Sequence, residues 1–235
     1  MRKVRIIGRG RAGESLGNAL GSAGWEVLGY LGRDHDLSTA SLGADVLVIA
    51  TPDDRVASVA ESVRPTPTTL VLHLSGALGL DVLEGHPRRA AMHPLVSLPS
   101  ADLGTGRLRG AWFAVVGDVE VDSLVDSLGG RSFAVDESAR PLYHAAAVIS
   151  SNHLVALLGQ AERVADLAGV PLEVMLDLAR DTIDNVRRLG PAAALTGPAA
   201  RGDEATIARH LEALPPDERA VYEALVNEAK RLAES

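Results

Sequence analysis

The sequence offers few side chains that could transfer a proton in catalysis. Only two of its 23 basic residues are lysines, Lys3 and Lys230, and both lie near the chain ends. The chain has no cysteine, which excludes disulfides, thiolate catalysis and cysteine zinc sites. Any proton transfer must therefore involve one of the seven histidines, one of the three tyrosines, a carboxylate or water.

His93 is one candidate, because it follows the predicted strand segment 89–92 and precedes Pro94. The proline fixes the turn, and the apolar residues after it could shift the pKa of the imidazole. The alternative is that a histidine before proline has only a structural role. We predict that His93 lies at a strand end and takes part in acid–base chemistry.

A second group of polar side chains lies inside an apolar segment, 142–168, that has helical character. His144, Val148 and Asn152 fall on one helix stripe at a spacing of four. Buried polar groups need partners, so the group is either an internal hydrogen-bond network or a ligand-binding face. We predict that Asn152 binds a ligand and that His144 is the second acid–base candidate. The group comprises Tyr143, His144, Ser151, Asn152 and His153.

The N-terminal segment has the pattern that binds the phosphates of a dinucleotide. Residues 4–7 are typical of a buried strand, the glycines of a G-x-G-x-x-G turn follow, and apolar residues then recur at helical spacing. Such glycines allow a tight turn, close approach to a pyrophosphate and close helix–strand packing. Chance is the alternative, because 23 of the 235 residues are glycine. The predicted turn comprises Gly8, Gly10, Arg11, Ala12 and Gly13.

The choice of cofactor depends on the end of the next predicted strand, 25–31. NAD sites place a carboxylate there, about 20 residues beyond the glycines, whereas NADP sites place an arginine beside the 2′-phosphate. Arg33 has this spacing, and Asp34 is the competing residue one position later. We predict NADP as the cofactor, the alternative being that Arg33 is only a solvated loop cation.

Two further strands are predicted over 44–50 and 69–74, and each is followed by a short loop. Ligands of open α/β sheets lie beyond the carboxyl ends of the strands, so Thr51, Pro52 and Ser75 should border the cofactor. The residues after Pro52 could instead be a plain helix N-cap. His73 lies inside its strand and is expected to be a hydrogen-bonded core residue.

The order of the elements predicts two domains. Strands and helices alternate through residues 1–137, which predicts an α/β, doubly wound parallel sheet. Residues 138–235 are predicted to be all helix, with Asp203 as one N-cap. Because the helix over 142–168 is apolar on all sides, it should be covered by its own domain and by a second subunit, forming a homodimer.

The charge of the chain limits its partners. The net charge is −8 and no basic stripe with aromatic residues occurs, so we expect no nucleic acid and no membrane partner. No ligand set for a metal is predicted. The apolar run at the N-terminus is too short for a signal peptide or a membrane span, so a cytoplasmic location is expected.

Longer segments resemble Rossmann-like proteins that are proposed NADP oxidoreductases and whose C-terminal module is a domain of unknown function. The resemblance covers nearly the whole chain. The segments are GRGRAG at 8–13, Gly32-Arg33, VIATPDD at 48–54, HLSGAL at 73–78, MHPLVS at 92–97, LYHAAAVISSNHLVALL at 142–158 and ALTGPAARGDEATIARHL at 194–211.

More distantly, the sequence is similar to ketopantoate reductase, pyrroline-5-carboxylate reductase and the 6-phosphogluconate and 3-hydroxyisobutyrate dehydrogenases, which usually dimerise through a helical C-terminal domain. The hydroxyacid dehydrogenases of this group place a catalytic lysine four residues before an asparagine. Here Asn152 remains, but Val148 occupies the lysine position. Their lysine-based proton transfer therefore cannot be carried over to this chain.

The resemblance implies hydride transfer between NADPH and a small carbonyl or imine substrate bound between the two domains. Asn152 would hold the substrate oxygen or nitrogen, and His93 or His144 would exchange the proton. The alternative function is a catalytically silent NADP sensor or regulatory protein, which the absence of the lysine makes credible.

Overall fold

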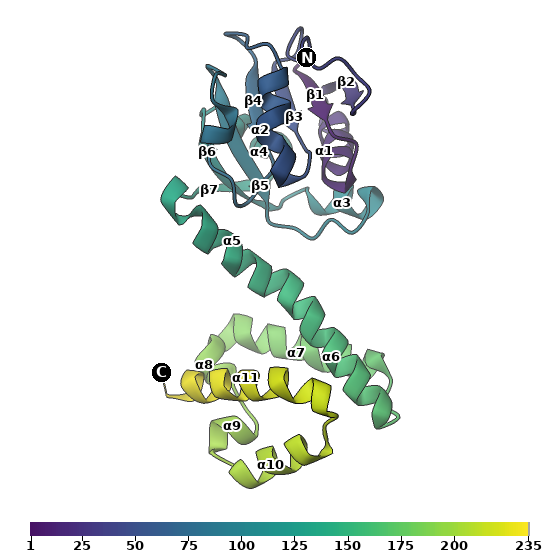
Figure 1. Ribbon diagram of the computed structural model, residues 1–235, viewed down its shortest axis with the longest axis vertical. Helices are drawn as coiled ribbons and strands as arrows, with labels where there is room; N and C mark the ends of the chain where they lie inside the picture. The colour runs from purple at the N-terminus through teal and green to yellow at the C-terminus, as the bar shows by residue number, and fades with distance from the viewer. Residues whose placement is uncertain (235) are drawn as a thin grey trace. The chain divides into compact units, whose positions relative to one another are not determined.

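The computed structural model describes residues 1–234, which form two compact units, Met1–Ser151 and Asn152–Ser235. Each unit is described by itself, and Figure 1 shows the elements of both. The chain becomes helical at Glu137, close to the predicted change at 137, but the first unit extends to Ser151. The start of the long helix contacts the sheet unit, since Arg140 donates to the carbonyl of Ser75 and the hydroxyl of Tyr143 lies 2.6 Å from Nδ1 of His93.

The first unit contains a seven-stranded sheet with strand order β2-β1-β3-β4-β5-β6-β7. Strands β1 to β5 are parallel, β6 is antiparallel to β5, and β7 is parallel to β6. The predicted α/β, doubly wound parallel sheet is confirmed, and β5–β6 is the one antiparallel pair among the strands that the structure describes. The strands are β1 (Lys3–Ile7), β2 (Glu26–Leu31), β3 (Val46–Ile49), β4 (Leu70–His73), β5 (Arg89–Pro94), β6 (Trp112–Gly117) and β7 (Arg131–Ala134).

The antiparallel pair arises from the connection over 95–111. In this connection helix α3 (Ala101–Arg107) packs against α1 (Arg11–Ser22). The chain does not return to the opposite end of the strands before β6 begins. Strand β6 therefore begins at the same end of the sheet at which β5 finishes. Hydrogen bonds in this unit include Leu95 N–H to the carbonyl of Trp112, 2.9 Å long, which fixes the return.

Helices and loops cover both faces of the sheet. One core cluster contains Ile6, Val48 and Phe113, and a second contains Leu47 and Ile49, which alternate with the first set along the strands. Since both faces are buried, β3 and β4 are buried at every position, as expected for central parallel strands. The other helices here are α2 (Asp53–Ser62), α4 (Val121–Ser127) and a 3₁₀ turn, Asp81–Leu83.

The long helix predicted over 142–168 is present, with one irregularity. After a 3₁₀ turn, Glu137–Ala139, it runs through α5 (Arg140–Val148), a π-helical turn (Ile149–His153) and α6 (Leu154–Leu167). In a π-helical turn the backbone bonds join i and i+5, so the side-chain spacing from residue 149 onward differs from that of a regular α-helix. Asn152 lies within this turn.

Five further helices complete the described part of the second unit. The Asp203 carboxylate accepts from the Thr206 N–H at 3.0 Å and caps α10, as predicted. By length and composition alone, Glu137–Leu167 could cross a membrane, a weak criterion that soluble helices also meet. The later helices are α7 (Leu172–Leu189), α8 (Pro191–Ala194), α9 (Pro198–Arg201), α10 (Glu204–Ala213) and α11 (Pro216–Ala233).

Candidate functional site

The glycine turn between β1 and α1 has the geometry of a phosphate cradle. Gly8 has φ +105°, and a Cβ there would lie 2.5 Å from the carbonyl oxygen of Ala50. A Cβ on Gly13 would lie 2.2 Å from the Gly8 carbonyl oxygen, whereas one on Gly10 would meet no atom of the described chain within 4 Å. Gly10 is also the N-cap of α1 and offers no side chain to its first N–H groups. The turn therefore leaves open space at a helix N-terminus, where a pyrophosphate fits.

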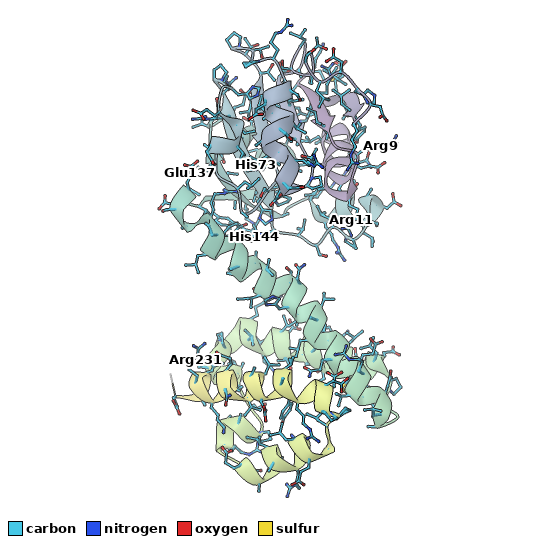
Figure 2. All side chains as sticks on the ribbon, viewed as in Figure 1. Arg9, Arg11, His73, Glu137, His144 and Arg231 are labelled. Atoms are coloured by element: carbon cyan, nitrogen blue, oxygen red, sulfur yellow. The ribbon has the colours of Figure 1, made fainter. Side chains whose placement is uncertain are left out.

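Three arginines surround this turn, and all three side chains are exposed: Arg9, Arg11 and Arg33. Figure 2 labels Arg9 and Arg11 beside α1. Arg9 lies 3.8 Å from Glu14 and 5.8 Å from the ring centre of Tyr30. Arg33 lies two residues after the end of β2 and forms no ion pair with residues 1–234. Its guanidinium is therefore available to an anionic ligand.

Thr51 and Pro52 follow β3, at the carboxyl edge of the sheet. The hydroxyl of Thr51 is buried and has no hydrogen-bond partner in the part of the chain that the structure describes. Pro52 is the N-cap residue of α2, and no side chain caps this helix, so the plain N-cap alternative is wrong. Asp53 instead points to the neighbouring strand end.

Ser75 organises the loop after β4. Its hydroxyl donates to the Asp53 carboxylate at 2.8 Å and accepts from the N–H groups of Ala77 and Leu78, each at 3.1 Å. We predicted that Ser75 borders the cofactor, but these bonds direct its hydroxyl into the loop. His73 is fully buried, as predicted, with one ring nitrogen 3.0 Å from the Gly79 carbonyl and the other accepting from Ser75 N–H.

Two histidines and a tyrosine meet beside this loop. The hydroxyl of Tyr143 lies 2.6 Å from Nδ1 of His93, and the ring of His144 is centred 5.6 Å from that of His93. A Cβ on Gly76 would lie 2.5 Å from Nδ1 of His144 and 2.9 Å from Nδ1 of His93. The cluster therefore requires glycine at position 76. Figure 2 labels His144, which lies on α5, and His73, which lies at the end of β4.

His93 lies at the carboxyl end of β5, one residue before its last residue, as predicted. Burial, followed by the positive charges of His144 and Arg140, lowers the pKa of His93 to about 4, and Asp53 opposes this shift. Burial raises the pKa of Tyr143 to about 12. Both side chains are consequently neutral near pH 7.

Arg140 is a functional candidate that the sequence analysis missed. Its side chain is fully buried at the start of α5, and Nη2 donates to the carbonyl of Ser75 at 2.7 Å. Nε and Nη1 are buried without partners among residues 1–234. Burial lowers the pKa of Arg140, while Tyr143 and Glu137 oppose this shift. The Glu137 carboxylate accepts from Leu80 N–H at 2.9 Å and joins the helix start to the loop.

The predicted site residues fall into different parts of the chain. His93 and His144 meet within the first unit, whereas Asn152 belongs to the second unit. Nothing in the sequence patterns indicated that Tyr143 would contact His93. No group of three or more histidine, aspartate or glutamate side chains suited to a metal occurs among the described residues.

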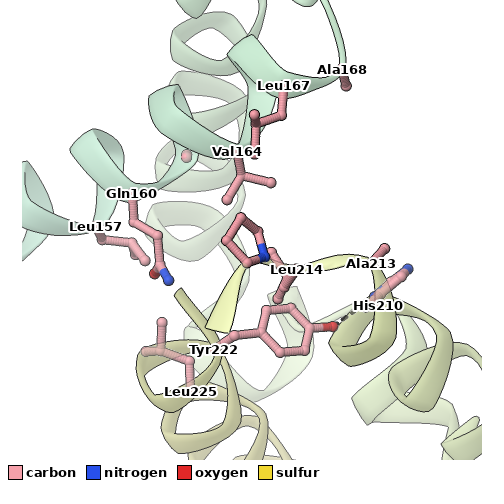
Figure 3. Close-up of a pocket in the computed structure, with 12 residues that line it drawn as sticks. Leu157, Gln160, Val164, Leu167, Ala168, His210, Ala213, Leu214, Tyr222 and Leu225 are labelled. Carbon is pink, nitrogen blue, oxygen red and sulfur yellow. Dashed lines mark hydrogen bonds between the residues drawn. The ribbon is translucent and has the colours of Figure 1, made fainter. Parts of the chain in front are cut away.

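The second unit contains an apolar cavity of about 580 Å³ between α6, α10 and α11, shown in Figure 3. Leu157, Val164 and Leu225 are among its walls. Its polar feature is the contact of the Tyr222 hydroxyl with Nδ1 of His210, 2.6 Å apart. This cavity has the character of a packing surface, since it has no charged residue in its walls.

Comparisons with known proteins were informative for both parts of the chain. Residues 117–229 match the family model of a domain of unknown function (DUF2520). The structure resembles BF3122 from Bacteroides fragilis, described as a proposed NADP oxidoreductase, with a TM-score of 0.81, 22% identity and 98% coverage of each chain. It also resembles protein TM1727 from Thermotoga maritima, with a TM-score of 0.75, 22% identity and 98% coverage of each chain.

A third solved structure is the pyrroline carboxylate reductase of Plasmodium falciparum with NADP bound, with a TM-score of 0.65, 14% identity and coverage of 99% of this chain and 98% of that one. No curated protein is significantly similar in sequence. At these identities the structural likenesses establish the fold. Residues 117–229 thus match the domain of unknown function, and the whole chain has the Rossmann-like fold of the NADP oxidoreductases that its sequence resembles.

Proposed function

We propose that this protein is an NADP-dependent reductase that transfers a hydride between NADPH and a small carbonyl or imine substrate. The observation that carries the proposal is that the open phosphate cradle and the cluster around the neutral His93 belong to the same sheet unit. Both lie at the carboxyl edge of the parallel strands, where ligands of such sheets bind.

Several features of the first unit support binding of the cofactor. The backbone at Gly8, Gly10 and Gly13 would hold the pyrophosphate, and Arg33 would hold the 2′-phosphate. Thr51, with its unpartnered hydroxyl, would border the ribose or nicotinamide. When bound, the reduced nicotinamide supplies the hydride that the protein itself cannot provide. The similar fold of an NADP-bound pyrroline carboxylate reductase is consistent with this assignment.

The protein would contribute position and a proton. His93 carries the proton for the substrate, with His144 beside it, and Asn152 holds the substrate oxygen or nitrogen. Because the pKa of His93 is lowered to about 4, the histidine acts as a neutral donor and not as an imidazolium. No lysine is needed for this chemistry.

We propose further that the second unit forms a homodimer. Helix α7 exposes an apolar row, and α6 beside it exposes Val155 and Leu167. Rows of this length on a soluble protein mark an interface. Two ion pairs within α7, Arg180–Asp177 and Arg187–Asp184, offset part of the charge on this helix, which lowers the repulsion between two copies of the same surface. The row comprises Val174, Leu176, Leu178, Ile183, Val186 and Leu189.

The function is tested by titrating the protein with NADPH and NADH and following the fluorescence of the reduced nicotinamide. We expect NADPH to bind more tightly, and Arg33→Ala to weaken NADPH by about 10-fold or more, since hydrogen bonds to charged groups contribute about 1.5–3 kcal/mol. NADH affinity should change little in this variant. The NADP assignment would be refuted if NADPH and NADH bound with equal affinity and Arg33→Ala changed neither affinity.

Turnover is tested by following NADPH oxidation with a panel of small ketones, aldehydes and cyclic imines. Oxidation above the background rate with at least one of them is expected. If NADPH binds but no compound in a broad panel is reduced, the sensor function replaces the reductase function.

A further inference from the structure

The contact between Tyr143 and His93 joins two elements that lie far apart in the sequence. Tyr143 comes from α5 and His93 from β5, and the oxygen lies 2.6 Å from Nδ1. The two rings meet edge to face, with their centres 5.7 Å apart and an angle of 80° between the planes. This distance is short for an O–H···N bond and leaves no room for water between the groups.

The chemistry of the two groups determines the direction of this bond. The phenol is the better donor, and the imine nitrogen of a neutral imidazole is the better acceptor, so Tyr143 O–H donates to Nδ1. His93 then carries its own proton on Nε2. That nitrogen has no hydrogen-bond partner in residues 1–234 and is not among the buried unpartnered atoms, so it is open to a ligand.

A neutral imidazole can give up the Nε2 proton only if Nδ1 gains one at the same time. The groups that face His93 keep it neutral, because His144, Arg140 and burial disfavour the imidazolium and only Asp53 favours it. The one proton within bonding distance of Nδ1 is that of the Tyr143 hydroxyl. The geometry therefore links the two proton positions.

We propose that Tyr143 supplies, through His93, the proton that the reduced substrate takes up, and that Arg140 stabilises the tyrosinate left behind. This inference rests on the proposed reductase function. As the hydride adds to the substrate carbon, the substrate oxygen or nitrogen bonds to the Nε2 proton. The N–H bond at Nε2 breaks, the O–H bond of Tyr143 breaks, and a new N–H bond forms at Nδ1. In the return step the N–H bond at Nδ1 breaks and its proton goes back to the tyrosinate oxygen, while Nε2 takes a proton from water and leaves hydroxide.

Arg140 has the position that this role requires. It lies three residues before Tyr143 on α5, so the two side chains are neighbours on the helix. The guanidinium is fully buried and forms no ion pair with any described residue, although Nη2 binds the carbonyl of Ser75. Glu137 acts on this cation only from beyond ion-pair distance, and a buried cation without a directly paired carboxylate favours an anion nearby. The tyrosinate would be that anion, and Tyr143 is a positioning residue that acts through His93.

The first test measures the tautomer of His93 by ¹⁵N NMR of the imidazole nitrogens, with and without NADP⁺. The expected result at pH 7 is a neutral ring with the proton on Nε2. In Tyr143→Phe the preference for Nε2 should weaken, because Nδ1 loses its donor. A wild-type ring protonated on Nδ1, or on both nitrogens, at pH 7 would overturn the relay whatever the substrate is.

The second test uses turnover of whichever compound in the carbonyl and imine panel is reduced. Tyr143→Phe should lower kcat by about 100-fold or more, the usual contribution of proton transfer, while NADPH affinity stays within about 2-fold. The matched control is Tyr222→Phe, which removes a hydroxyl at the same 2.6 Å from a histidine Nδ1 in the second unit and should leave kcat unchanged.

A purely structural role of Tyr143 and the proton relay predict different pH dependences of kcat. In the wild type, kcat should be flat until the tyrosine titrates at high pH, and Tyr143→Phe should remove this alkaline limb. Full turnover by Tyr143→Phe would overturn the relay and leave the reductase function intact. Failure of the wild-type protein to bind NADPH would instead overturn the reductase function, and the relay with it.

Discussion

Replacing Gly10 with alanine separates the cofactor site from the stability of the fold. Gly10 has φ −83° and ψ −179°, which any residue adopts, and its added Cβ would meet no described atom within 4 Å. Alanine is a poorer N-cap than glycine, but it also lowers the entropy of the unfolded chain. These effects are each about 0.5–1 kcal/mol and of opposite sign. We therefore expect the Tm of Gly10→Ala to stay within about 3 °C of the wild type.

Binding of NADPH should respond quite differently. The methyl group would occupy the space in which the pyrophosphate approaches the N-terminus of α1, and charge-assisted hydrogen bonds would lengthen. Each is worth about 1.5–3 kcal/mol, so the Kd should rise by about 10-fold to 100-fold. The assay is a fluorescence titration with NADPH, run beside a thermal melt of the same sample.

The matched control is Gly13→Ala in the same turn. Its Cβ would lie 2.2 Å from the Gly8 carbonyl oxygen, so the backbone must move. Overpacking of this kind costs about 1–3 kcal/mol, and the Tm should fall clearly in this variant. If Gly10→Ala bound NADPH as tightly as the wild type, the pyrophosphate could not lie at Gly10, and the reasoning from the open space would be refuted.

Three other predictions concern separate parts of the molecule. Gly76→Ala should push the ring of His144 aside, since its Cβ would lie 2.5 Å from Nδ1, and turnover should fall more than NADPH affinity. Hydrogen bonds from Arg88 lower the pKa of Asp118, so this pair stabilises the fold above the ordinary aspartate pKa and loses its effect as pH falls through the lowered value. The stability advantage of the wild type over Asp118→Asn in thermal melts should therefore be present at pH 7 and shrink as the pH falls through the lowered pKa of Asp118; an advantage that stays constant into the acidic range would contradict this. Leu178→Glu should convert a dimer to a monomer in sedimentation, and a monomeric wild type would contradict the homodimer.

The glycine turn and the strand positions could be predicted because their signals are local. A strand followed by glycines at fixed spacing gives one backbone path, and Gly8 has the positive φ that the first turn requires. The strand ends were predicted within about two residues, since buried parallel strands are continuous apolar runs. Thr51 accordingly lies where the sequence placed it.

The contacts of the cluster formed by His93, Tyr143 and His144 could not be predicted in this way. Tyr143 and His93 are 50 residues apart, and their contact depends on how the start of α5 packs against β5. An arginine at the start of a helix is usually exposed, and no pattern in the sequence indicates that Arg140 is buried. The π-helical turn at Asn152 also lacks a local signal, and it removes the simple spacing that grouped this residue with His144.

The absence of a lysine on the long helix is therefore weak evidence against catalysis. A lysine gives its proton as a cation, and a cation at Val148 would lie one turn from His144, close to a cluster that already contains the buried charge of Arg140. A hydroxyl and a neutral imidazole transfer a proton without adding charge to this region. If the relay is correct, Tyr143 and His93 supply by a change of tautomer what the related dehydrogenases obtain from their lysine, and Val148→Lys should impair turnover instead of restoring a lost function.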